Sequence, residues 1–197
     1  MRTFLFLLAL CSSVLAAPPN MEEIMELMKH MQSMPNPNCE KFPNGTDSKA
    51  NWYMCDDVKN DGTIYDMKFQ DTATNKDEYP IQLKKPLNVV MDIKSPGTYS
   101  SINLDIDIYS WGGWSGCSWH KVPTFGLLNN LDACSNGVPC PIQSGRHTIT
   151  INLDFSKYSS IIGLLTDDSP YQLHYKLTDN KSKKATCAIV QARAKTK

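Results

Sequence analysis

The most reactive side chains in this 197-residue chain are its seven cysteines. Cys134 and Cys140 flank the turn-forming residues Gly137 and Pro139, and an alternating apolar run follows from Ile149. Two cysteines on either side of such a turn are close enough to oxidise, and the strand that follows is then pinned at its entrance. The sequence therefore predicts a disulfide-closed strand connection here, and not a metal site.

Residues 1–17 have the pattern of a signal peptide. Arg2 supplies a positive charge, residues 4–10 form an apolar stretch, and small residues end the segment at Ala16 and Ala17. Cleavage there removes Cys11 and leaves six cysteines, an even number that predicts three disulfides in a secreted chain. Asn44 and Asn180 begin glycosylation sequons that secretion makes usable. No other apolar segment approaches the roughly 20 residues of a membrane span, so we expect a secreted, soluble protein.

Other residue types give no support for catalysis. The four histidines are scattered, and neither a His-x-x-x-His pair, a Gly-x-Ser-x-Gly elbow nor a phosphate-binding glycine loop is present. His174, Asp105 and Asp107 fall on the polar faces of predicted strands, where solvent exposure explains them. Acidic and basic residues number 20 each, which does not favour nucleic-acid binding. We expect no enzyme activity, no metal and no cofactor.

The elements that position these residues change in character along the chain. Residues 18–50 are predicted to form a short amphipathic helix followed by a linker that contains three prolines. Asn20 can cap the helix with Glu23 in reply, and one face carries Met21, Ile24, Met25, Met28 and Met31. A methionine stripe suits either packing on the chain's own domain or a site for a protein partner, and both interpretations stay open.

From residue 51 the apolar period changes from 3.6 to 2, which predicts strands. Regular alternation covers residues 65–69, 87–93, 102–108, 147–155, 171–177 and 187–192, with a less regular piece at 114–122. Seven short strands separated by turn signals predict an all-β fold, an immunoglobulin-like sandwich of two antiparallel sheets over residues 51–197.

Three segments of this region resemble the ML family of lipid-recognition domains, which includes the ganglioside activator protein and the Niemann-Pick type C sterol carrier. They are Trp52 to Asp56, Cys134 to Gly145, and Tyr171 to Tyr175 with the following strand that begins at Cys187. The resemblance covers roughly residues 51–197. It pairs Cys55 with Cys187 and Cys134 with Cys140, which leaves Cys39 and Cys117 as the third pair.

The resemblance implies that the two sheets enclose an apolar cavity for a lipid. Alternation alone predicts burial and does not distinguish such a cavity from a packed core. The inward-facing candidates for the cavity wall are Met67, Phe69, Val89, Met91, Leu104, Ile106, Ile151, Leu153, Leu173 and Tyr175.

Two loop regions carry apolar residues without strand periodicity and are predicted to form the mouth of the cavity. One contains Trp111, Trp114, Trp119 and Phe125, and the other contains Ile161, Ile162, Leu164 and Leu165. Such side chains suit insertion into a membrane interface or folding back as lids over the core, and the sequence does not decide between the two.

The expected function is therefore that of a secreted or lysosomal protein that binds and transfers a sterol, phospholipid or glycolipid. We expect a monomer that contacts membranes transiently and meets a protein receptor or a lipid-processing enzyme. The alternative is a secreted recognition module, such as an innate-immune lipid co-receptor, that binds a protein through the methionine-rich helix or the apolar loops.

Overall fold

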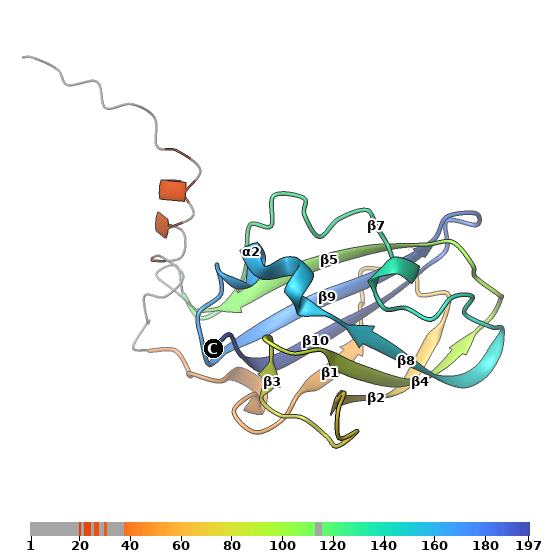
Figure 1. Ribbon diagram of the computed structural model, residues 1–197, viewed down its shortest axis with the longest axis horizontal. Coiled ribbons are helices and arrows are strands. Elements are labelled where there is room, and N and C mark those ends of the chain that lie inside the picture. The colour runs from red at the N-terminus through yellow and green to blue at the C-terminus, as the bar shows by residue number, and fades with distance from the viewer. Residues whose placement is uncertain (1–19, 21, 25, 28–29, 31–37, 113–115) are drawn as a thin grey trace, which may run out of the picture.

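The chain folds into two β-sheets that face each other (Figure 1). This computed structural model describes residues 20, 22–24, 26–27, 30, 38–112 and 116–197. The larger sheet has the order β1 (Asn51–Met54), β10 (Ala185–Lys195), β9 (Ser169–Asp179), β5 (Ile102–Trp111) and β6 (Trp119–Lys121), with β3 (Ile81–Gln82) beside β10 and β7 (Leu131–Asp132) beside β5. The smaller sheet has the order β2 (Thr63–Asp71), β4 (Leu87–Ser95) and β8 (Gly145–Leu153). The predicted β-sandwich is confirmed.

Every alternating run that the sequence analysis identified contains a strand, but the strand edges differ in places. The predicted run at 147–155 ends as a strand at Leu153, because the Asp154 side chain accepts a hydrogen bond from the Ser156 amide (3.0 Å) and starts the 3-10 helix η3 (Phe155–Tyr158). The short strands β1, β3 and β7 were not predicted, since two to four residues are too few to show a period. One of them, β3, pairs in parallel with β10.

Alternation on the facing strands builds the interior. On β4 the side chains of Leu87, Val89, Met91 and Ile93 are buried. On β5, buried Leu104 lies opposite Leu177 of β9 in the strand pairing. Since side chains alternate across a sheet, the residues between these positions point to the outside of the sandwich.

Three disulfides tie the chain together, and each joins a predicted pair. Cys39 is bonded to Cys117, Cys55 to Cys187 and Cys134 to Cys140, with Cα atoms 5.3, 5.4 and 5.5 Å apart. The second bridge spans 132 residues and joins the chain just after β1 to β10. In the chain-entropy description a loop of that length contributes about 5 kcal/mol and the short 134–140 loop about 2 kcal/mol.

The N-terminal segment begins with the expected helix cap. The Glu23 amide donates to Asn20 Oδ1 and the Asn20 amide donates to Glu23 Oε2, both at 2.9 Å, and residues 22–24, 26–27 and 30 are helical. Of the predicted apolar face, Ile24 is described, whereas residues 21, 25, 28 and 31 lie outside the described residues.

Residues 38–50, which the sequence analysis assigned to a linker, contact the outer face of the larger sheet. The Trp111 indole donates to the Glu40 carbonyl (2.8 Å), and Asn44 Nδ2 donates to Gln191 Oε1 (2.8 Å). The Cys39–Cys117 bridge holds the same segment. This stretch therefore covers the sheet and shields the buried side chain of Gln191.

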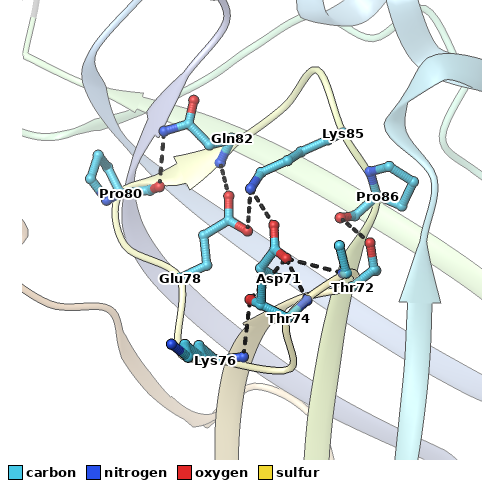
Figure 2. Close-up of polar contacts among 10 residues, drawn as sticks. Asp71, Thr72, Thr74, Lys76, Glu78, Pro80, Gln82, Lys85 and Pro86 are labelled. Atoms are coloured by element: carbon cyan, nitrogen blue, oxygen red, sulfur yellow. Dashed lines mark hydrogen bonds and ion pairs between the residues drawn. The ribbon is translucent and has the colours of Figure 1, made fainter.

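The connection between β2 and β4 crosses from the smaller sheet to the larger one, where its strand β3 pairs with β10. Figure 2 shows the polar cluster that fixes this connection: the Lys85 ammonium lies between the Asp71 and Glu78 carboxylates, 3.2 Å from Glu78 Oε2. The hydrogen bond from Lys85, with those from the Thr74 amide and hydroxyl, lowers the pKa of Asp71 to about 2. The cluster thus holds the connection that carries Ile81 and Leu83 toward the interior of the sandwich.

Candidate functional site

A cavity of about 460 Å³ lies between the two sheets. All ten predicted wall residues border it. The smaller sheet contributes Met67, Phe69, Val89, Met91, Ile151 and Leu153, and the larger sheet contributes Leu104, Ile106, Leu173 and Tyr175. The strand pairing explains this grouping, since directly opposed residues on neighbouring strands share one face of a sheet. Val89 lies opposite Ile151, and Ile106 lies opposite Tyr175.

The inner face of β10 explains why the interior is hollow. Ala188, Val190, Ala192 and Ala194 alternate along this strand and all border the cavity. Three of these four side chains are single methyl groups, which leave space that leucine or isoleucine would fill. The sequence analysis missed them, although their alternation with the polar residues Gln191 and Arg193 could have identified this face.

The segment 155–165 forms one border of the cavity. It contains η3 and the short helix α2 (Ser159–Ile162), and the side chains of Ile161, Ile162 and Leu165 border the cavity. Ile161 is 2% exposed, and Leu164 and Leu165 are each 7% exposed. In this conformation the segment packs inward as a lid, which is one of the two arrangements considered for it.

The other predicted mouth region divides into an outer part and an inner part. Trp111 and Trp119 lie opposite each other on β5 and β6 with ring centroids 5.2 Å apart, and neither is among the described residues that border the cavity. The reason is the alternation of β5: Leu104, Ile106 and Ile108 face inward, so Trp111 faces outward. Trp114 lies outside the described residues.

The loop that follows β6 has side chains that point into the protein and side chains that point into solvent. Leu128 borders the cavity and is 3% exposed, and its carbonyl accepts a hydrogen bond from the Ile106 amide (2.8 Å). Phe125 and Leu127 face solvent and are 50% and 53% exposed. Phe125 therefore does not border the cavity, but it lies three residues from a side chain that does.

A polar corner borders the cavity where the Cys134–Cys140 loop meets η3. The Tyr158 hydroxyl donates to Asn136 Oδ1, and Lys157 Nζ donates to the Ser135 carbonyl at 3.3 Å. Gly137 is required here because its φ is +95° and a Cβ atom would lie 1.9 Å from the Asn152 carbonyl oxygen. The sequence analysis interpreted this disulfide loop only as a strand connection and did not place it on the cavity wall.

The two tyrosines that β9 contributes to the cavity wall differ in their hydrogen bonding. The Tyr171 hydroxyl donates to the Thr166 carbonyl (2.8 Å), whereas the buried Tyr175 hydroxyl has no hydrogen-bond partner among the described residues. Burial raises the pKa of both phenols well above the usual value. Both side chains are therefore neutral and able to donate a hydrogen bond at physiological pH.

The polar face of the larger sheet shows how the candidate catalytic residues are used. The His174 ring lies 4.7 Å from the Tyr109 ring, and its Nε2 is 2.9 Å from Gln172 Nε2. The side chain is therefore half-buried, whereas the sequence analysis predicted a solvent-exposed residue. Burial lowers the pKa of His174. Asp107 forms an ion pair with Lys121 (2.8 Å), and Asp105 accepts a hydrogen bond from the Asn130 amide (2.8 Å).

Metal-ligating residues do not cluster in the part of the chain that the structure describes: no three His, Cys, Asp or Glu side chains are grouped to hold an ion there. No described helix is long and apolar enough to cross a membrane. Of the two sequons, Asn180 is exposed in a turn, where its Nδ2 donates to Ser101 Oγ at 3.0 Å. Asn44 is exposed as well, but Thr46 of the same sequon is fully buried.

Comparison with known proteins identifies one family. Residues 49–194 match the family model of the ML domain. Among solved structures, the fold is similar to a Niemann-Pick type C2 protein from Japanese carpenter ant, with a TM-score of 0.42 and 15% identity over 73% of this chain and 99% of that chain. It is also similar to the C-terminal domain of wzt, with a TM-score of 0.38 and 10% identity over 75% of this chain and 78% of that chain. No curated protein matches significantly.

Proposed function

Because this chain belongs to the ML-domain family of lipid-binding proteins, we propose that it holds a lipid between its two sheets and transfers it between membranes. The observation that carries the proposal is the 460 Å³ cavity with walls of aliphatic and aromatic side chains. Its volume lies within the range of roughly 300–1,000 Å³ that is usual for small-molecule sites. The lipid is a sterol or the acyl part of a phospholipid or glycolipid.

The size of the cavity sets the energy that a lipid can gain. A methylene group occupies about as much volume as a water molecule in the liquid, roughly 30 Å³. The 460 Å³ cavity therefore has room for roughly 15 methylene groups. With about 0.8 kcal/mol for each buried methylene, an acyl chain of that size gains on the order of 12 kcal/mol before ordering costs. A membrane offers the same chain a comparable gain, so a lipid can exchange between the membrane and the cavity without a cofactor or a covalent step. We propose no catalytic activity.

The proposed route of the protein rests on the sequence of residues 1–17 and on the disulfides. We propose that residues 1–17 direct it to the secretory pathway, with the extracellular space or the lysosomal lumen as its destination. Three disulfides support this proposal, since they persist in oxidising compartments. The exposed Asn180 is the better placed of the two glycosylation sites.

Contact with membranes is assigned to the loop around Phe125 and Leu127, because these two side chains are exposed whereas Ile161, Leu164 and Leu165 are buried. The same loop carries Leu128 on the cavity wall. A membrane that receives Phe125 and Leu127 therefore lies against a loop that borders the lipid. Transfer can then proceed without exposing the whole apolar chain to water.

Organic extraction of the protein purified from secreting cells, followed by mass spectrometry, tests the proposal. We expect one lipid class in near-stoichiometric amount. A protein that carries no lipid, and that takes up neither a fluorescent sterol nor a fluorescent fatty acid, would contradict the carrier function and favour the recognition module that binds a protein partner. A bound protein partner recovered together with lipid would leave the carrier function intact.

A further inference from the structure

Tyr175 is a residue of the cavity wall whose hydroxyl group stands out among the described polar groups there. Tyr175 lies in β9 between Ile106 of β5 and Ala188 of β10, and its ring borders the cavity. The hydroxyl is buried and has no hydrogen-bond partner among the described residues. Buried polar groups in native proteins almost always have partners, so this hydroxyl requires an explanation.

The other tyrosines on the cavity wall show that the omission is local. The Tyr171 hydroxyl donates to the Thr166 carbonyl, and the Tyr158 hydroxyl donates to Asn136. Tyr171 and Tyr175 are four residues apart on the same face of one strand. They therefore differ in whether the hydroxyl has a hydrogen-bond partner, and not in the strand that carries them. The side chain of Tyr175 borders the cavity, so its hydroxyl lies within the length of one ring from a lipid held there.

The surroundings of Tyr175 define the chemistry of that oxygen. Burial and the nearby Tyr158 raise the pKa of Tyr175, so its phenol remains a donor. The charged residues that border the cavity are Asp154 and Lys157, and both already have partners: Asp154 accepts from the Ser156 amide and Lys157 donates to the Ser135 carbonyl. The strand neighbours of Tyr175 are the apolar residues Ile106 and Ala188, and burial of a carboxylate beside such side chains costs far more free energy than burial of a neutral oxygen.

We propose that the Tyr175 hydroxyl donates a hydrogen bond to an uncharged oxygen of the bound lipid, namely a hydroxyl or an ester carbonyl that lies inside the cavity. The inference rests on the proposed lipid-binding function and makes it specific. The protein then selects lipids that carry a neutral oxygen within the part that is buried, over hydrocarbon of the same length. Tyr175 is a specificity residue and takes part in no reaction.

The test compares Tyr175→Phe with Tyr109→Phe, a control on the outer face of the same sheet, where Tyr109 of β5 stacks on His174. The competitors are a long-chain alcohol, a fatty-acid methyl ester and an alkane of equal length, each displacing a fluorescent naphthylamine probe. We expect the wild type to bind the alcohol and the ester more tightly than the alkane. Since a neutral hydrogen bond contributes modestly, Tyr175→Phe should weaken alcohol and ester binding about fivefold and leave alkane binding unchanged. Tyr109→Phe should keep the wild-type preference.

A second measurement addresses the ligand-free protein. Phenylalanine removes an unsatisfied hydroxyl at position 175 but a satisfied one at position 171, so the thermal midpoint should stay level or rise for Tyr175→Phe and fall for Tyr171→Phe. An unchanged preference for oxygenated lipids in Tyr175→Phe would overturn the inference while the carrier function stands. Failure of the wild type to bind any of the three lipids or a fluorescent sterol would overturn both.

Discussion

Replacing Leu153 with tryptophan should weaken lipid binding without unfolding the protein. Leu153 ends β8, borders the cavity and is only partly buried, so a larger side chain can extend into open volume. Tryptophan adds about six non-hydrogen atoms to leucine and takes the space of a similar number of lipid methylenes. At about 0.8 kcal/mol each, the lost burial amounts to as much as about 5 kcal/mol. Because a lipid can shift within the cavity, the measured affinity should fall by at least about tenfold.

Leu104 provides the matched control, since it borders the same cavity but is 1% exposed. Its side chain is closely packed, so Leu104→Trp should force strain into the core and lower the free energy of unfolding by about 1–3 kcal/mol. Both variants are titrated with a fluorescent sterol and with a fluorescent fatty acid, and both are unfolded in urea.

The cavity reasoning would be refuted if Leu153→Trp lost 1–3 kcal/mol of stability and kept its lipid affinity, because that result describes a solid core at this position. It would also be refuted if saturating lipid failed to raise the wild-type midpoint, since a ligand that binds only the folded state must stabilise it.

Three further predictions concern the surface and the loops. The double variant Phe125→Ser with Leu127→Ser removes two half-exposed apolar side chains, whose burial in a membrane interface is worth about 2 kcal/mol. Lipid transfer between vesicles should slow at least tenfold, while the affinity for detergent-dispersed lipid stays constant. Unchanged transfer would exclude this loop as the membrane contact. The pKa of Asp71 is lowered to about 2, so its contribution to stability is full above its unfolded pKa of about 4 and is lost as the pH falls toward 2. Asp71→Asn should therefore be less stable than wild type to urea at neutral pH. A loss of stability that is equally large at pH 2 would disprove the role of the Asp71 carboxylate. Gly137→Ala should destabilise strongly and lower lipid binding, because the added Cβ would lie 1.9 Å from a backbone oxygen; a thermal midpoint like that of wild type would contradict the geometry.

The sandwich and most of the cavity wall were predictable because they depend on alternation. A strand such as β5 shows its inner and outer faces directly in the sequence, from Ile102 to Ile108. The alternation also predicted that residues such as Met67 and Leu173 face inward, and both border the cavity. Such a prediction is possible because a sheet face follows from the alternation within one strand.

Features that depend on contacts between distant segments could not be predicted in this way. The aromatic residues Trp111 and Trp119 looked like loop residues because their run is short, yet strand pairing turns both away from the cavity. The polar corner requires the Cys134–Cys140 loop to contact η3, and the periodicity of the sequence does not predict that contact. Nor does any pattern show that Tyr171 finds a carbonyl while Tyr175 does not.

The small side chains on the inner face of β10 have a consequence for the mechanical behaviour of the protein. A ligand-free molecule that keeps an apolar void loses that volume when it unfolds, so hydrostatic pressure favours the unfolded chain. A lipid that fills the space removes this penalty. The empty protein should therefore unfold at a lower pressure than the lipid-bound protein. Ala188, Ala192 and Ala194 thus make the empty protein more sensitive to pressure than the lipid-filled one.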